Sequence, residues 1–144
     1  MDKYEESVLG YITAETHRFV NPQFDIQYQN KEGGSCPDFV VIDYKDKTIY
    51  IVEVSIASNI SGLIEKVKER DARWISPIKN HFYELNHEFD KWEYRITVFV
   101  RDTNKNQFQS KFDSSPDVSV KSIEDISFPH LWMWNGNKPN NSLR

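Results

Sequence analysis

The chain has 144 residues and a formal net charge of -4, with 18 Lys and Arg against 22 Asp and Glu. This length is typical of one domain with its own core, and a composition of 38% hydrophobic and 28% charged residues is typical of a soluble protein. The acidic balance excludes a broadly basic surface, on which non-specific nucleic-acid binding depends. We therefore expect a single domain over residues 1–144, and any contact with nucleic acid must be local.

Targeting and redox features are few. The opening segment M-D-K-Y-E-E-S lacks the basic and then apolar order of a secretory signal, and the apolar runs are too short to span a membrane. The single cysteine, Cys36, excludes an internal disulfide, and no Cys/His spacing is typical of a structural zinc site. These features predict a cytoplasmic protein without membrane association.

The first predicted element is a helix over residues 4–19, whose apolar stripe also includes Glu15. Residues 23–29 alternate between polar and apolar and predict a half-exposed strand. Residues 39–44 and 48–57 are rich in Val, Ile and Tyr, and a short polar turn between them predicts a hairpin. The second arm is apolar on both faces, which is typical of a central strand covered by helices.

Further along the chain, apolar residues at helical spacing predict a helix over 60–75 and a second, short helix over 78–85. Residues 94–101 alternate again and predict a strand, which a polar stretch over 102–116 follows. The weaker C-terminal pattern predicts an edge strand over 118–121, a turn of helix over 122–126 and an apolar strap over 128–134. The alternative for the last segment is an exposed aromatic platform for base stacking.

The predicted hairpin brings two carboxylates together. With a two-residue loop at Lys45-Asp46, or a four-residue loop over 44–47, the register places Asp38 opposite Glu53. Directly opposed residues share one face of a sheet, with Cβ atoms about 4.5–5.5 Å apart. Two carboxylates so close repel each other unless a cation or a proton lies between them. The pair therefore destabilises the fold, and a function that needs both carboxylates would explain why the pair is present.

Oxygen-only ligands of this kind are suited to Mg²⁺ or Mn²⁺, which bind through one or two carboxylates together with water and substrate phosphate. Glu15 is the candidate for a third ligand, because a carboxylate on the apolar face of a helix needs a partner. The alternative is that Glu15 extends to solvent at the edge of the helix. Glu53 lies in an otherwise apolar strand, where a carboxylate without a counter-charge or metal is expensive.

The segments Pro37-Asp38 and Glu53-Val54-Ser55, together with the element order, resemble the PD-(D/E)XK superfamily of restriction-endonuclease-like nucleases over residues 4–101. The resemblance implies an α/β (α+β) fold with a mixed central sheet, an α-β-β-β-α-β core and, here, a C-terminal extension. It implies metal binding by Asp38 and Glu53, with Glu15 matching the helical Glu of some members. It also implies an Mg²⁺- or Mn²⁺-dependent endonuclease that cuts DNA or RNA, with DNA favoured, and a homodimer in many members.

The chain departs from the family pattern at Ser55, which stands where the family has a lysine. In active members this lysine positions the attacking water and offsets charge at the phosphate. Some members supply the lysine from the following helix, where this chain has Lys66, Lys68 and Arg70. We expect Ser55 with Lys68 or Arg70 to complete the catalytic group. The alternatives are a catalytically inactive nuclease-like module that binds nucleic acid or protein, and a structural subunit whose carboxylates are paired with Arg or Lys.

Overall fold

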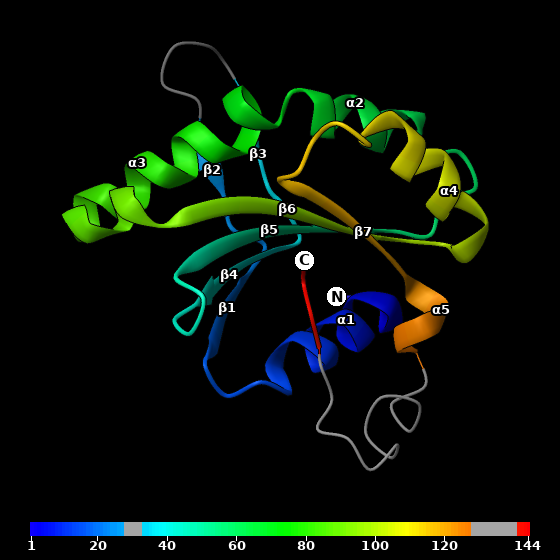
Figure 1. The fold of residues 1–144 in the computed structure, drawn as a ribbon, viewed down its shortest axis with the longest axis horizontal. Coiled ribbons are helices and arrows are strands. Elements are labelled where there is room, and N and C mark those ends of the chain that lie inside the picture. The colour runs from blue at the N-terminus through cyan, green and yellow to red at the C-terminus, as the bar shows by residue number, and fades with distance from the viewer. Residues whose placement is uncertain (28–32, 128–140) are drawn as a thin grey trace.

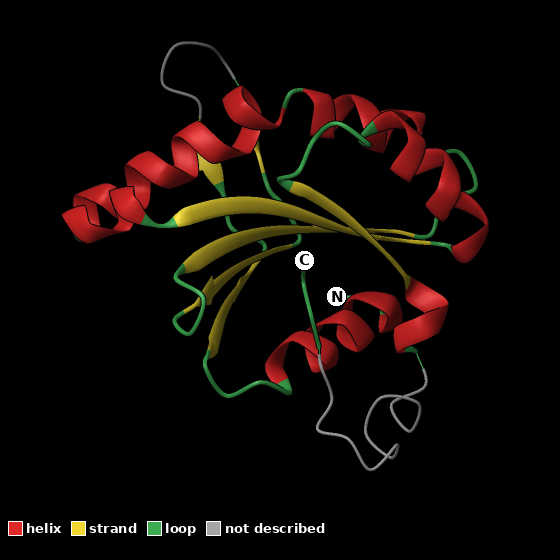
Figure 2. Cartoon of the chain, in the orientation of Figure 1, coloured by secondary structure: helices red, strands yellow, loops and turns green. Residues whose placement is uncertain are grey.

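The computed structural model describes residues 1–27, 33–127 and 141–144. Its centre is a five-stranded mixed sheet with helices on both faces (Figures 1 and 2). In sheet order the strands are β1 (Arg18–Pro22), β4 (Phe39–Asp43), β5 (Thr48–Ser55), β6 (Glu93–Val100) and β7 (Val118–Ser122). β1, β4 and β5 are antiparallel, whereas β5, β6 and β7 are parallel. The predicted mixed α+β class is confirmed.

The helices separate into two layers. Their bounds are α1 (Lys3–Thr13), α2 (Ser61–Lys68), α3 (Ser76–Leu85), α4 (Asp102–Lys111) and α5 (Ile123–Ile126). α2, α3 and α4 cover one face of the sheet, and α1 and α5 cover the other (Figure 1). The sheet thus divides the apolar interior into two clusters, as expected when crossover helices connect parallel strands. None of the helices in the described ranges is long and apolar enough to cross a membrane.

The β4–β5 hairpin has the predicted register. Phe39 pairs with Val52 and Asp43 pairs with Thr48, so the four-residue loop between the strands is the one that forms. Side chains of a strand alternate between the two faces. Tyr50 and Val52 accordingly belong to the cluster beneath α1, and Ile51 belongs to the cluster beneath α2. By the same alternation Glu53 faces the α2 layer, at the open end of the hairpin.

The N-terminal prediction was wrong at two boundaries. The first helix ends at Thr13, because Arg18–Pro22 pairs with β4 as an edge strand instead of continuing the helix. No strand covers all of 23–29 either: Gln23 has a positive φ of 54°, and only Ile26–Gln27 (β2) pairs, with Gly34–Ser35 (β3). Residues 28 and 29 lie outside the described part. Pairing with β4 decided these boundaries, and helical periodicity cannot detect such pairing.

The remaining differences between prediction and structure mainly concern the helices, one of which is interrupted and one of which was not predicted. The helix expected over 60–75 is interrupted: α2 ends at Lys68 and a π-helical turn, η1 (Asp71–Ile75), leads into α3. A 3₁₀ turn, η2 (His87–Lys91), follows α3. The polar stretch over 102–116 contains α4, which was missed because its buried face consists of Asn104 and Phe108 alone. The edge strand and helical turn at the C-terminal end are confirmed as β7 and α5, and the apolar strap over 128–134 lies outside the described residues.

Candidate metal-binding carboxylate site

Asp38 and Glu53 are joined where the open end of the hairpin meets the end of the sheet. The backbone N–H of Asp38 donates to Glu53 Oε1 over 3.2 Å, and the backbone N–H of Val54 donates to Asp38 Oδ2 over 2.7 Å. Glu53 is 9% exposed and Asp38 is half-buried. The prediction that the two carboxylates are neighbours is confirmed. A backbone N–H beside each carboxylate donates a hydrogen bond to the other carboxylate.

This environment disfavours the charged form of both acids. Burial, followed by the charge of Asp38, raises the pKa of Glu53 to about 7, although Lys66 and the Asp38 N–H oppose the change. Burial raises the pKa of Asp38 to about 6, against the hydrogen bond from Val54. The two groups interact, so their protons dissociate as a pair. Raised pKa values from burial and like charge are typical of functional sites.

A third carboxylate approaches the pair from α1, and it belongs to Glu5. Its hydrogen bond and charge raise the pKa of Asp38 further. A capping box holds Glu5 in place, because its Oε2 accepts from the N–H of Asp2 over 3.0 Å. The sequence contained a signal for this residue: Glu5 precedes Val8 by three positions and Ile12 by seven, so it lies on the same helical stripe.

The structure places Glu15 elsewhere, which corrects its assignment as the third ligand. Because α1 ends at Thr13, Glu15 lies in the following loop, with its Oε2 3.9 Å from Nδ1 of His17. His17 in turn lies 3.4 Å from Asp43, at the turn end of the hairpin. Glu15 therefore lies near the opposite end of β4 from Asp38. The prediction failed because it required a helix that continued to residue 19.

Two cations act on the pair from the α2 side. Lys66, on α2, lowers the pKa of both Asp38 and Glu53, and Arg73 lowers that of Glu53. Lys66 is exposed and its ammonium makes no hydrogen bond or ion pair with a described residue. Arg73 lies in the π-helical turn η1, a form that is often found at functional sites. Its Nε is buried without a hydrogen-bond partner, whereas its Nη2 contacts Glu69 at 3.0 Å.

Of the three cations that the sequence offered on this helix, Lys66 acts on the pair, whereas Lys68 and Arg70 lie in other contacts. Lys68 is half-exposed and 3.4 Å from Glu65. Arg70 binds both oxygens of Asp117, over 2.7 and 3.0 Å, beside the start of β7 and away from the carboxyl end of β5. The π-helical turn follows Arg70, and periodicity alone could not distinguish Lys66 from Lys68. Ser55 does share the face of Glu53, and its Oγ accepts from the N–H of Ala57 over 3.3 Å.

The donor set has the chemistry that a hard divalent cation prefers, namely carboxylate oxygens held at the edge of a hydrophobic layer. Within residues 1–27, 33–127 and 141–144, no three Asp, Glu, His or Cys side chains form a group that could hold a metal ion. Asp38 and Glu53 are thus a two-carboxylate site, with Glu5 outside it. None of the ion pairs between described residues includes either member, so the guanidinium of the structural alternative is not found here.

Comparisons of the chain with protein-family models, with curated proteins and with solved structures found no match.

Proposed function

We propose that this chain is a metal-dependent nuclease that hydrolyses phosphodiester bonds at Asp38 and Glu53. DNA is favoured over RNA as its substrate. One observation carries the proposal: two neighbouring carboxylates have pKa values raised by burial and face Lys66, a lysine without an ion pair. Such a pair destabilises a fold unless a cation or a proton relieves the repulsion. Mg²⁺ and Mn²⁺ are suited to two carboxylates completed by water and a substrate phosphate.

The order of elements supports the same proposal. One helix, three antiparallel strands, a helical crossover and a parallel strand occur in the order α1, β1, β4, β5, α2–α3 and β6, with the separate β2–β3 pair inserted between β1 and β4. This order agrees with the one that the resemblance to the restriction-endonuclease-like nucleases implies, and it supports the assignment of Asp38 and Glu53 to the Pro-Asp and Glu positions of that pattern. The C-terminal extension then adds α4, β7 and α5.

The residues of the proposed site have different chemical roles. Asp38 and Glu53 would hold the cation, and the backbone hydrogen bonds that they accept fix one oxygen of each carboxylate. The chemistry that Mg²⁺ or Mn²⁺ would supply here is activation of a water and compensation of charge at the phosphate. Lys66 supplies the positive charge that Ser55 lacks, and it can orient the attacking water or stabilise the phosphate oxygens. Arg73 adds a second positive charge on the same side.

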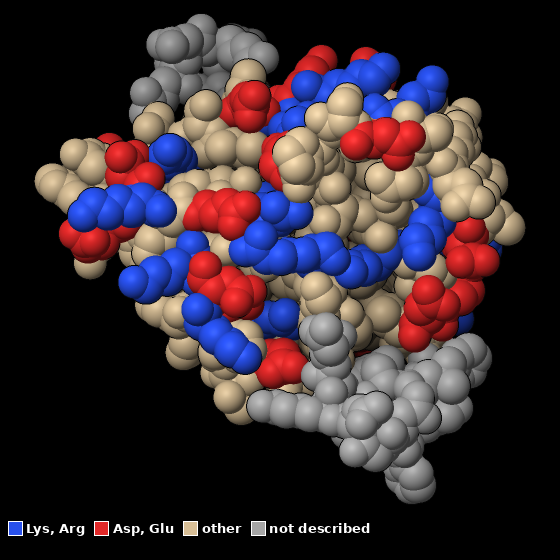
Figure 3. All heavy atoms as spheres, in the orientation of Figure 1, with Lys and Arg blue, Asp and Glu red and all other residues tan. Residues whose placement is uncertain are grey.

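A local basic surface is compatible with this function on a chain of net charge -4. Figure 3 shows a band of Lys and Arg side chains across the middle of one face, over the region of β6 and β7, with acidic side chains above and below it. These strands carry Arg95 and Lys121. Burial, and to a lesser degree the nearby Lys105, lower the pKa of Lys121. Phosphate contacts require such a concentration of charge.

The test is cleavage of labelled single-stranded, duplex and branched DNA and RNA with Mg²⁺, with Mn²⁺ and with EDTA. Cleavage should need the metal, and Glu53→Gln should reduce its rate about a thousandfold, which is about 4 kcal/mol of lost transition-state stabilisation. The matched control is Glu65→Gln on α2, whose carboxylate is largely exposed. A Glu53→Gln protein that cuts as fast as the wild type would refute the proposal.

A second candidate is a nuclease-like module that binds nucleic acid without cutting it. Two observations favour it: Ser55 replaces the family's lysine, and no group of three possible metal ligands is found among the described residues. Titration calorimetry with Mn²⁺ separates the candidates. No metal uptake, together with oligonucleotide binding, would establish the second; uptake that Asp38→Ala abolishes would support the first.

A further inference from the structure

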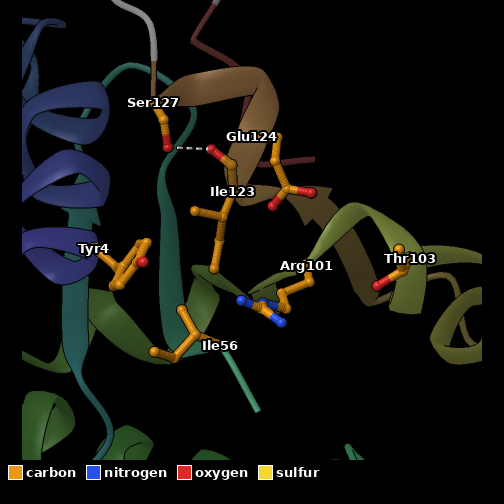
Figure 4. Close-up of a pocket in the computed structure, with 7 residues that line it drawn as sticks. All are labelled: Tyr4, Ile56, Arg101, Thr103, Ile123, Glu124 and Ser127. Atoms are coloured by element: carbon orange, nitrogen blue, oxygen red, sulfur yellow. Dashed lines mark hydrogen bonds between the residues drawn. The ribbon is translucent and has the colours of Figure 1, made fainter. Parts of the chain in front are cut away.

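A cavity lies between α1, α5 and the segments that follow β5 and β6. Its volume is about 290 Å³, and the lining residues come from four elements or the loops at their ends (Figure 4): Tyr4, Ile56, Arg101, Thr103, Ile123, Glu124 and Ser127. The segments that follow β5, β6 and β7 all contribute to it. In open α/β sheets, ligands bind outside the carboxyl ends of the strands, which is where this cavity lies.

The cavity is continuous in sequence with the proposed metal site at two points. Tyr4 directly precedes Glu5, whose carboxyl contacts Asp38. Ile56 follows Glu53 by three residues, which is about 10 Å along an extended strand. About three stacked nucleotide steps span that distance.

The lining combines a charged end with an apolar wall. The guanidinium of Arg101 points toward Ile56 and Ile123 in Figure 4, and it makes no hydrogen bond or ion pair with a described residue. The acidic neighbour Glu124 is engaged elsewhere, because its Oε2 accepts from the backbone N–H of Asp102 over 2.6 Å. Arg101 is therefore the available anion-binding group among the described residues that line the cavity, and Thr103 also lines it.

The apolar wall is suited to a base or sugar. Ile56 is 40% exposed, an unusual state for such a side chain at the end of a core strand. The ring of Tyr4 stands across the cavity from Arg101 (Figure 4), with the ammonium of Lys3 5.1 Å from its centre. Aromatic and aliphatic surfaces beside a cation are the recurring elements of single-strand recognition, where bases stack and phosphates pair.

We propose that this cavity binds one unstacked nucleotide of the substrate strand, with Arg101 on its phosphate and Tyr4 and Ile56 against its base. The inference rests on the proposed nuclease function and defines its substrate class as single-stranded or locally unpaired nucleic acid. A base inside a duplex cannot enter such a cavity without leaving the stack, which costs a few kcal/mol. Duplex substrates should therefore be cut more slowly than single strands of the same sequence.

The experiment titrates the full chain with dTMP, thymidine and inorganic phosphate in EDTA, following backbone amide signals by NMR. We expect dTMP to shift the signals of Ile56, Thr103 and Ile123, and to bind more tightly than either fragment. Arg101→Met should weaken dTMP about tenfold, the effect of one charge-assisted hydrogen bond. Lys111→Met, an exposed cation at the other end of α4, is the control and should leave the affinity unchanged.

A second variant separates base from phosphate recognition. Tyr4→Leu should weaken dTMP but leave the affinity for phosphate unchanged. Equal affinity of phosphate and dTMP would overturn the nucleotide assignment in favour of a simple anion site. No shift at the three cavity amides would overturn it altogether.

The outcomes also distinguish this inference from the nuclease proposal. Metal-dependent cleavage without dTMP binding at the cavity would refute the subsite and leave the nuclease intact. Binding of dTMP at the cavity by a chain that cuts no substrate would refute the nuclease and leave a nucleotide site. Where both hold, Arg101→Met should lower the ratio of single-strand to duplex cleavage, whereas Lys111→Met should not.

Discussion

The two ends of the β4–β5 hairpin both bury carboxylates, but in opposite electrostatic situations. At the turn end, Asp43 is 0% exposed, yet Arg18 Nε lies 3.2 Å from it and the N–H groups of Lys45 and Asp46 donate to it over 3.1 and 3.0 Å. At the open end, Asp38 and Glu53 receive one backbone N–H each and no ion pair from the described residues.

This difference separates a structural carboxylate from a candidate functional one. Burial is common to both ends, so burial alone does not indicate function. What differs is the counter-charge: Arg18 compensates Asp43 directly, whereas Lys66 and Arg73 act on the open end only through space. A compensated acid closes the turn, and the under-compensated pair is where we propose that a cation binds.

The largest expected effect concerns the compensated end. Asp43→Asn should destabilise the chain by about 3–5 kcal/mol, because it leaves the guanidinium of Arg18 buried without its partner. The side chain of Arg18 is only 6% exposed. Urea unfolding measures the change. The control is Asp90→Asn, which disrupts an exposed pair with Lys79 and should cost less than about 1 kcal/mol. Equal losses in the two variants would remove the distinction between buried and exposed pairs.

The next effect concerns the cation at the open end. Lys66→Met should lower the cleavage rate about a hundredfold, or about 2.7 kcal/mol, by removing the charge that faces both carboxylates. Lys68→Met, two residues along the same helix, is the matched control because its ammonium contacts Glu65 instead. Single-turnover cleavage distinguishes the two variants. If Lys68→Met were the slower enzyme, the assignment from the sequence would be right and ours would be wrong.

Neutralising the open end should stabilise the fold. In EDTA at about pH 8, Glu53→Gln should raise the free energy of unfolding by about 1–3 kcal/mol, because a pKa raised from 4.5 to about 7 makes the charged form costly. The folded chain keeps this proton up to about pH 7, whereas the unfolded chain releases it near pH 4.5. Wild-type stability therefore falls as the pH rises through that window, and the advantage of the variant should vanish near pH 4.

That stability prediction uses urea unfolding at several pH values, with Glu65→Gln as the control on an exposed acid. A Glu53→Gln protein less stable than the wild type at about pH 8 would mean that the carboxylate is compensated, as Asp43 is.

The smallest effect is the pH dependence of metal binding. Burial holds the pKa of Asp38 at about 6 and that of Glu53 at about 7. Below about pH 7, a metal ion must therefore displace protons from these carboxylates when it binds. The affinity for Mn²⁺ should rise about tenfold or more between about pH 6 and pH 8, as measured by calorimetry. Glu53→Gln should flatten the profile. An affinity independent of pH would place the metal away from this pair.

The sequence by itself determined the central features. Alternation and β-branched residues predicted the hairpin and its position in the sheet, and loop length then set the register that joins Asp38 and Glu53. Register follows from local turn geometry, so no long-range information was needed. The same local signals identified β7 and α5 correctly.

Only the tertiary structure decided which other residues meet the pair. Glu5, and not Glu15, acts on Asp38, because β1 takes residues 18–22 into the sheet and shortens α1. Of the cations that the sequence offered, Lys66 acts on the pair, whereas Lys68 contacts Glu65 and Arg70 binds Asp117. The π-helical turn adds Arg73, which the sequence did not indicate. Strand pairing at an edge and the phase of an interrupted helix depend on contacts far apart in the chain, which local periodicity cannot contain.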